Sequence, residues 1–181
     1  MAAALSDAFP VVTEKGMVDA ERRLGFPLPT LLRRVLTELG NGGESLGGGL
    51  YGVPSSKGAH CHHDGRTMLE FRQMYIEPED DEAVLLAKAV PICDLGDAQW
   101  LWLDCAGGGD GTILVMAGVD LFRTQSTFRD YWSSWLEGTT TELLFIEGKP
   151  RESLNPFTKQ KAIFRDFIPR GTKIHSMGDG E

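Results

Sequence analysis

The chain has 181 residues, 41% of them hydrophobic and 24% charged, which is typical of a globular protein with a full core. No apolar run approaches the roughly 20 residues that a membrane helix needs, and the start of the chain lacks the pattern of a secretory signal. The formal net charge of −8 disfavours nucleic-acid binding, which requires a basic face. Three cysteines without paired spacing disfavour a disulfide framework, so we expect a cytoplasmic protein.

Two amphipathic helices are predicted before residue 40. The apolar face of the first, at residues 13–24, consists of Met17, Ala20 and Leu24. Pro29 suits the first turn of the second helix, where an amide hydrogen has no partner to lose. The apolar stripe of this second helix follows the helical repeat and consists of Leu28, Leu31, Leu32, Val35, Leu36 and Leu39. Such a stripe has to be buried, so we expect the helix to lie against a sheet formed by later residues.

The ends of these two helices carry typical capping residues. Gly25 ends the first helix, and Gly40 and Asn41 can adopt the positive φ that closes the second. Glu21 lies near the end of the first helix, and we expect its carboxylate to cap amides at the start of the second. We favour this structural role over a catalytic one, because no acid or base lies nearby in the sequence to act with Glu21.

Two polar loops follow. The glycines of residues 41–52 come after a helix, whereas phosphate loops precede one, so we expect a surface loop that leads into a short strand at residues 50–53. The second loop, residues 54–66, contains adjacent residues of metal-ligand type: His60, Cys61, His62, His63 and Asp64. Neighbouring residues rarely direct their side chains to one ion, and a second ligand pair is missing, so we expect neither a metal nor a cofactor.

The most acidic stretch of the chain follows a short predicted helix. That helix covers residues 67–75, and its apolar side consists of Met68, Phe71, Met74 and Tyr75. Residues 77–82 have the sequence EPEDDE, and residues 83–88 can continue as a helical turn. Such an acidic run is usually a solvated turn, but it is also where a basic partner is attracted most strongly.

Residues 89–116 predict a strand hairpin and a third strand. We expect strands at residues 90–95 and 99–105, with Gly96 and Asp97 in the turn, and a further strand at residues 112–116. Residues 99–105 are apolar on both faces, which favours a central strand with cover on both sides. The glycine-rich turn between the last two strands lacks the strand–turn–helix setting of a dinucleotide site.

One more helix and a C-terminal extension complete the prediction. Residues 120–123 lead to a helix that Thr124 or Ser126 could cap and that Gly138 ends. Its apolar stripe consists of Phe128, Tyr131, Trp132, Trp135 and Leu136. We therefore divide the chain into a domain at residues 1–138 and an extension at residues 139–181. Within the extension, residues 157–168 can form a helix, and we expect the last six residues to be disordered.

An ordered set of residues carries a resemblance to a known family. Its first part consists of Glu21, Leu24, Gly25, Leu28, Pro29, Asn41, Gly42 and Gly43. Its second part consists of Pro91-Ile92, Gly96-Asp97, the strand end at residues 101–104 and the helix Ser126 to Trp135. Together, over about residues 13–137, they resemble the SUKH superfamily, also called the Smi/Knr family of cell-wall regulators and bacterial immunity proteins. The match departs from the family at the residue between Ser126 and Phe128, and nothing in it corresponds to the extension.

The resemblance implies an α+β fold with a mainly antiparallel sheet flanked by helices. It also implies a non-enzymatic role. Many bacterial members of the family are immunity proteins that neutralise toxins, often nucleases or nucleic-acid deaminases, whereas fungal members are scaffolds in cell-wall signalling. The matched residues are mostly structural and indicate no partner site.

Three functions remain open. We favour a binding protein, and more specifically an immunity protein, because no complete catalytic set can be assembled and residues 1–137 carry a charge of −9. Its partner is then a basic toxin domain, bound without nucleic acid, membrane or cofactor. The expected partner surface consists of Glu77, Glu79, Asp80, Asp81 and Glu82, with Leu50 and Tyr51 of the glycine-rich loop. The alternatives are a signalling scaffold and a metal-dependent hydrolase that uses His60, His62 and His63 with Asp64 or Asp104.

Overall fold

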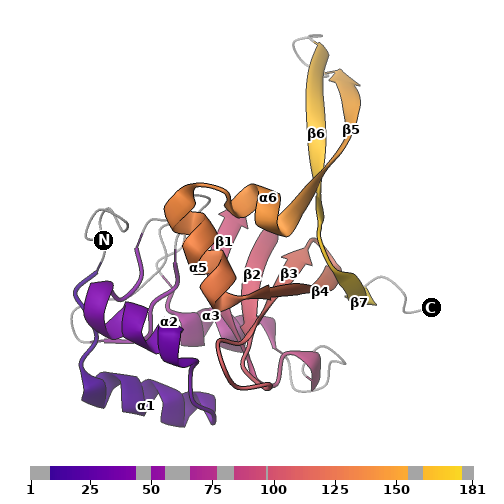
Figure 1. Ribbon diagram of the computed structural model, residues 1–181. Coiled ribbons are helices and arrows are strands. Elements are labelled where there is room, and N and C mark those ends of the chain that lie inside the picture. Colours follow the sequence, from indigo (N-terminus) through magenta and orange to yellow (C-terminus); the bar gives the residue numbers. More distant parts are fainter. Residues whose placement is uncertain are drawn as a thin grey trace.

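The computed structural model describes residues 9–43, 50–55, 66–76, 84–96, 98–154 and 161–176. The centre of the molecule is a five-stranded antiparallel sheet with the strand order β1-β2-β3-β4-β7 (Figure 1). These strands are β1 (Ala89–Gly96), β2 (Gln99–Asp104), β3 (Thr112–Ala117), β4 (Asp120–Thr127) and β7 (Thr172–Ser176). A second sheet pairs β5 (Phe145–Leu154) with β6 (Lys161–Pro169). The expected α+β fold with a mainly antiparallel sheet and a C-terminal extension is confirmed.

Helices surround the main sheet. The described helices are α1 (Glu14–Leu24), α2 (Thr30–Arg34), the π-helical turn η1 (Val35–Leu39), α3 (Met68–Tyr75), α5 (Phe128–Glu137) and α6 (Thr140–Leu144). The stripe predicted for the second helix is buried at its centre, since Leu32 and Leu36 have no exposed surface. This helix packs against α5, which in turn contacts β3 and β4, so helices share the cover of the sheet. Among the described residues, no helix combines the length and apolar character needed to cross a membrane.

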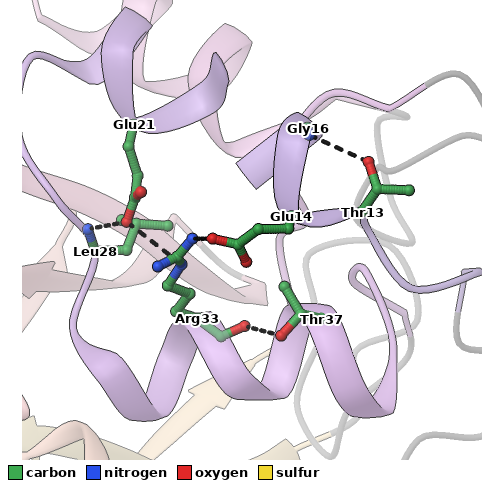
Figure 2. A network of polar contacts seen from close by, with 7 residues as sticks. All are labelled: Thr13, Glu14, Gly16, Glu21, Leu28, Arg33 and Thr37. Atoms are coloured by element: carbon green, nitrogen blue, oxygen red, sulfur yellow. Dashed lines mark hydrogen bonds and ion pairs between the residues drawn. The ribbon is translucent and has the colours of Figure 1, made fainter. Parts of the chain in front are cut away.

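A polar network joins α1 to α2 (Figure 2). The carboxylate of Glu21 accepts a hydrogen bond of 3.0 Å from the amide of Leu28 and so acts as a cap before the second helix, but on an amide that precedes the N-cap residue Pro29 and not, as we expected, on those of the first turn. The guanidinium of Arg33 forms an ion pair with Glu14, and its Nε lies 3.9 Å from Glu21. Because Arg33 belongs to α2 and both carboxylates belong to α1, these contacts fix the two helices side by side.

The end of the second helix differs from the prediction. The helix widens into η1, and the amide of Gly40 donates to the carbonyl of Val35, five residues earlier. Gly40 has a φ of 173°, which is extended backbone, so it does not form the left-handed cap we expected. The left-handed conformation occurs at Gly42, with a φ of 89°. Local sequence alone did not reveal this, because a π-turn moves the cap along the chain.

Asn41 ties the end of this helix to the segment at residues 50–53. Its side chain is fully buried and makes two hydrogen bonds to Val53: the amide of Val53 donates at 2.9 Å, and Nδ2 donates to its carbonyl at 2.8 Å. A Cβ atom on Gly52 would lie 2.1 Å from the carbonyl oxygen of Asn41, so only glycine fits there. The segment lies along β1 but does not form the short strand that we expected: Leu50 makes an isolated bridge to Cys93, and Tyr51 donates its amide to Ile92 at 3.1 Å.

The strand β2 has cover on both faces, as predicted. Trp102, Leu101 and Leu103 have no exposed surface, although neighbouring residues of a strand point to opposite faces. On one face of β2, the centroid of the Trp102 ring lies 6.2 Å from the ring centroids of both Phe71 and Tyr75 in α3.

Residues 120–127 form β4, although we expected them only to lead into the next helix. The cap of α5 is Thr127, not Thr124 or Ser126: the Thr127 hydroxyl accepts from the amide of Asp130 at 3.3 Å in a capping box. Thr124 is buried instead, and its hydroxyl donates to the carbonyl of Ile113 in β3 at 2.7 Å. Leu136, which we placed on the buried stripe, is 48% exposed. Pairing with β3 makes residues 120–127 a strand, and the local periodicity of the sequence does not reveal this pairing.

The helix predicted at residues 157–168 is wrong, because residues 161–168 belong to the strand β6. The segment is rich in β-branched and aromatic residues, which suit a strand, and its antiparallel pairing with β5 decides between the two structures. Residues 157–160 and all but Ser176 of the last six residues lie outside the described part of the chain. Residues beyond 138 also contribute to the main sheet, since β7 pairs with β4.

Candidate functional site

The predicted partner surface falls on two different parts of the molecule. Glu77, Glu79, Asp80, Asp81 and Glu82 lie outside the described residues. Leu50 and Tyr51 are described, and they are 1% and 0% exposed. Leu50 bridges to Cys93 in β1, and the ring of Tyr51 lies 4.9 Å from that of Phe71. We therefore remove both from the candidate surface: the nearby glycines suggested an exposed loop, but these two apolar side chains belong to the core.

The suggested hydrolase site is not assembled by the described residues. His60, His62, His63 and Asp64 lie outside them. Asp104 already has partners, since Oδ2 pairs with Arg123 Nη1 at 2.7 Å and Oδ1 accepts from the amide of Ala106 at 2.8 Å. This carboxylate therefore holds the turn after β2. Within the described ranges, no group of three or more histidine, cysteine or acidic side chains could hold a metal ion.

The described cysteines are unsuited to nucleophilic chemistry. Cys93 is buried, and Cys105 is partly buried directly after β2. Burial, with a smaller contribution from Asp104, raises the pKa of the Cys105 thiol to about 12. A thiol with such a pKa is protonated at neutral pH, whereas the reactive form is the thiolate. Neither thiol therefore indicates catalysis.

Two shallow clefts lie elsewhere on the surface. One of about 420 Å³ lies beside α1, and one of about 470 Å³ lies between β4, α6 and the start of β7. Neither lining includes a histidine or a cysteine. The second contains Arg123 and Arg170, but Arg123 pairs with Asp104 and Arg170 Nε donates to the carbonyl of Phe145 at 3.0 Å. These arginines thus join parts of the fold, and the acidic side chain of the first cleft, Asp19, pairs with Arg22.

Exposed apolar side chains flank the acidic stretch, which we define as residues 77–82. Met74 in α3 is 48% exposed, and Val84, on the other side of the stretch, is 78% exposed. We had assigned Met74 to the buried side of its helix, so its exposure is a correction. The helix ends one residue after Met74, so no further turn of α3 follows Met74 among the described residues. We name Met74, Tyr75 and Val84 the flanks of the acidic stretch.

Aromatic side chains pack against Tyr75, which with Met74 forms the flank before the acidic stretch. Tyr75 is partly buried, and its ring lies 4.8 Å from that of Phe71 and 5.1 Å from that of Trp100. Burial raises the pKa of the Tyr75 hydroxyl, and the nearby Asp94 adds to the shift. The phenol is therefore neutral at physiological pH, and it presents an apolar ring with one polar end, a combination common at protein interfaces.

Arg72 attaches the segment that follows Val84, the flank after the acidic stretch, to α3. Its Nε donates to the carbonyl of Ala89 at 2.8 Å, and its Nη2 donates to the carbonyl of Ala87 at 2.8 Å and of Leu86 at 3.4 Å. The guanidinium also lies 5.6 Å from the centre of the Phe26 ring. Nothing in the sequence indicated this role, because the carbonyls that Arg72 contacts lie 14 to 17 residues along the chain. The described residues on both sides of the acidic stretch are thus attached to one helix, α3.

The SMI1 / KNR4 family (SUKH-1) matches residues 12–137, the region from the start of α1 to the end of α5. No curated protein and no solved structure matches the chain. The motif residues that suggested the resemblance are structural: Glu21 caps the second helix, and Asn41 and Gly42 attach its end to residues 50–53. They define the fold, so the function has to be sought on the surface.

Proposed function

Because this chain belongs to the SMI1 / KNR4 family (SUKH-1), a family of non-catalytic domains, we propose that it is an immunity protein. In this role it binds a basic toxin domain of nuclease or deaminase type and blocks its active site. The observation that carries the proposal is the exposed apolar pair, Met74 and Val84, on either side of the most acidic stretch of the chain. We place the protein in the cytoplasm, on the basis of its cysteine content.

The flanks have the chemistry of an interface centre. Protein interfaces commonly combine an apolar centre with a polar rim, and a few central side chains supply most of the binding energy. Met74 and Val84 are exposed without a covering element among the described residues, and methionine adapts to irregular partner surfaces. The aromatic support beneath Tyr75 and the hydrogen bonds of Arg72 limit the ordering needed on binding, which favours affinity.

The negative net charge of the chain favours a basic partner. Residues 1–144 contain 21 Asp and Glu and 11 Lys and Arg, a formal charge of −10. Proteins that cleave or modify nucleic acids need a basic face, and an acidic inhibitor competes for that face. Complementary charge raises the association rate strongly at low salt. We therefore expect fast, salt-dependent association.

The test has two stages. Affinity capture from the source cells, followed by mass spectrometry, identifies the partner, and the purified partner is then assayed with and without one equivalent of this protein. We expect loss of its nuclease or deaminase activity. If the captured partner stays fully active in the complex, the immunity proposal is wrong, and the scaffold of the Smi/Knr type becomes the better explanation.

Variants then locate the surface. Met74→Ser and Val84→Ser are expected to weaken binding by about tenfold each, since each removes an apolar side chain from the centre of the interface. Val119→Ser is the matched control, because Val119 is 52% exposed in the turn between β3 and β4. Charge reversal at Asp80, Asp81 and Glu82 should slow association and reduce its salt dependence. If the control weakens binding as much as the flanks do, the surface is wrongly placed.

A further inference from the structure

The strands β5 and β6 form a two-stranded ribbon that projects from the rest of the molecule (Figure 1). Their antiparallel pairing runs from Phe145 with Pro169 at the base to Leu154 with Lys161 at the far end. In the described part of the chain, these strands pair with each other and belong to no larger sheet. The ribbon lies beyond residue 137, where the family match ends. It is therefore a feature that family membership does not explain.

The base of the ribbon is firmly anchored. Leu144 and Phe145 are 0% and 7% exposed, and the amide of Arg170 donates to the carbonyl of Leu144 at 2.7 Å. Directly above this base, Ile146 and Ile168 face each other across the two strands, and they are 50% and 51% exposed. A two-stranded ribbon is only marginally stable in water by itself. Within the described residues neither strand pairs with a third, and the exposed apolar pair at the foot of the ribbon indicates that another surface covers it.

The charge of the ribbon is opposite to that of the body. Residues 145–170 contain six Lys and Arg and three Asp and Glu, a formal charge of +3, whereas residues 1–144 carry −10. A nucleic acid would be attracted by the ribbon but repelled by the larger charge of the body. The acidic body of a second copy of this chain attracts the ribbon, and the body of the first copy attracts the ribbon of the second.

The available area favours a reciprocal arrangement. Nine residues of β5 and eight of β6 project beyond the base, which corresponds to about 30 Å of length and about 10 Å of width. One face of the ribbon thus covers roughly 300 Å², and a single contact would bury about 600 Å² in total, too little for a stable dimer. If each copy places its ribbon on the other, the total doubles to about 1,200 Å², the lower limit of stable interfaces.

From these observations we propose that the β5–β6 ribbon is a dimerisation arm. Each arm lies on the acidic body of a second copy, in a dimer with twofold symmetry, the commonest symmetry of protein oligomers. The inference does not depend on the proposed immunity function, since it concerns a different part of the chain and a different partner.

Sedimentation velocity on the full chain tests the proposal. At low salt and micromolar concentration we expect a mass of about twice the 19.9 kDa of one chain. Higher salt should dissociate this dimer, because ion screening weakens the attraction between arm and body. The variant Arg151→Glu with Lys161→Glu reverses two charges on the arm and should raise the dimer dissociation constant by at least about tenfold.

A charge-matched control separates the arm from net charge. Lys15→Glu with Lys88→Glu makes the same change at exposed positions of the body, and this variant should remain dimeric. The proposal is overturned if the wild-type chain is a monomer up to about 1 mM, a limit that corresponds to about −4 kcal/mol. It is also overturned if both double variants dissociate equally, or if salt strengthens the dimer, as expected for arms that pair only with each other. Binding of a labelled nucleic-acid duplex by a monomeric chain would assign the arm to a polyanion instead.

Discussion

Replacing Asn41 tests how strongly one buried side chain holds the N-terminal helices to the sheet. Asn41→Ala removes two hydrogen bonds of 2.8 and 2.9 Å and leaves the amide and carbonyl of Val53 without these partners. Each buried backbone group that loses its partner costs about 1–3 kcal/mol, so the free energy of unfolding should fall by about 4 kcal/mol. That is a large part of the 5–15 kcal/mol that is usual for a domain.

Urea unfolding, followed by tryptophan fluorescence, measures this loss. With an m-value of about 2 kcal/mol/M, the midpoint should shift by about 2 M. Gln73→Ala is the control, because Gln73 is exposed on α3 and its loss should change stability by less than about 0.5 kcal/mol. If Asn41→Ala loses less than about 1 kcal/mol, water replaces the side chain and the reasoning is refuted.

Asn41→Asp supplies a second readout for the same hydrogen bonds. The carboxylate keeps an acceptor for the amide of Val53 but cannot donate to its carbonyl. Burial beside a carbonyl should raise the pKa of the new carboxyl above that in the unfolded chain, so its penalty is smallest below about pH 4 and grows as the pH rises. A penalty that does not change between pH 4 and pH 7 would contradict the proposed donor role.

Two further predictions concern Arg72 and Cys105. Arg72→Met should lower the free energy of unfolding by about 3 kcal/mol and speed hydrogen exchange at residues 84–89, because it removes the donor of the hydrogen bonds to the carbonyls of Ala87 and Ala89. Arg34→Met is the control and should change stability little, because the Arg34 side chain is exposed beside Glu38. An unfolded thiol titrates near pH 8.5, whereas the folded pKa of Cys105 is about 12, so stability should fall by up to about 1.4 kcal/mol per pH unit above pH 8.5. Cys105→Ala should lack this part of the fall, and urea unfolding at pH 8 and pH 10 measures the difference.

Local signals in the sequence predicted the elements whose structure depends on nearby residues. The helices α1, α3 and α5 carry apolar stripes and end or begin at Gly25, Thr67 and Gly138, as expected. The hairpin of β1 and β2 also follows its alternating pattern. The cap formed by Glu21 was predictable because it lies only seven residues from Leu28.

Distant pairing explains most of the errors. The strand character of β4 and β6 depends on partner strands, and a window of a few residues contains no information about them. Leu50 and Tyr51 were placed on the partner surface because a glycine-rich loop precedes them, but they are buried through contacts with β1, some forty residues later. The acidic stretch was proposed as a partner surface from charge alone and stays a prediction, because its residues lie outside the described part of the chain. The exposure of Met74 and Val84 required knowledge of which apolar side chains the fold leaves uncovered.

The position of β7 has a consequence for shortened forms of the protein. The outer edge of β4 is covered by residues 172–176, which lie outside the family-matched region. Without them, the sheet would present an open row of amides and carbonyls, a template for unwanted pairing with other chains. Proteolysis or a premature stop after the family-matched region would create the same exposed edge, so a shortened chain is expected to aggregate even though its helices remain intact.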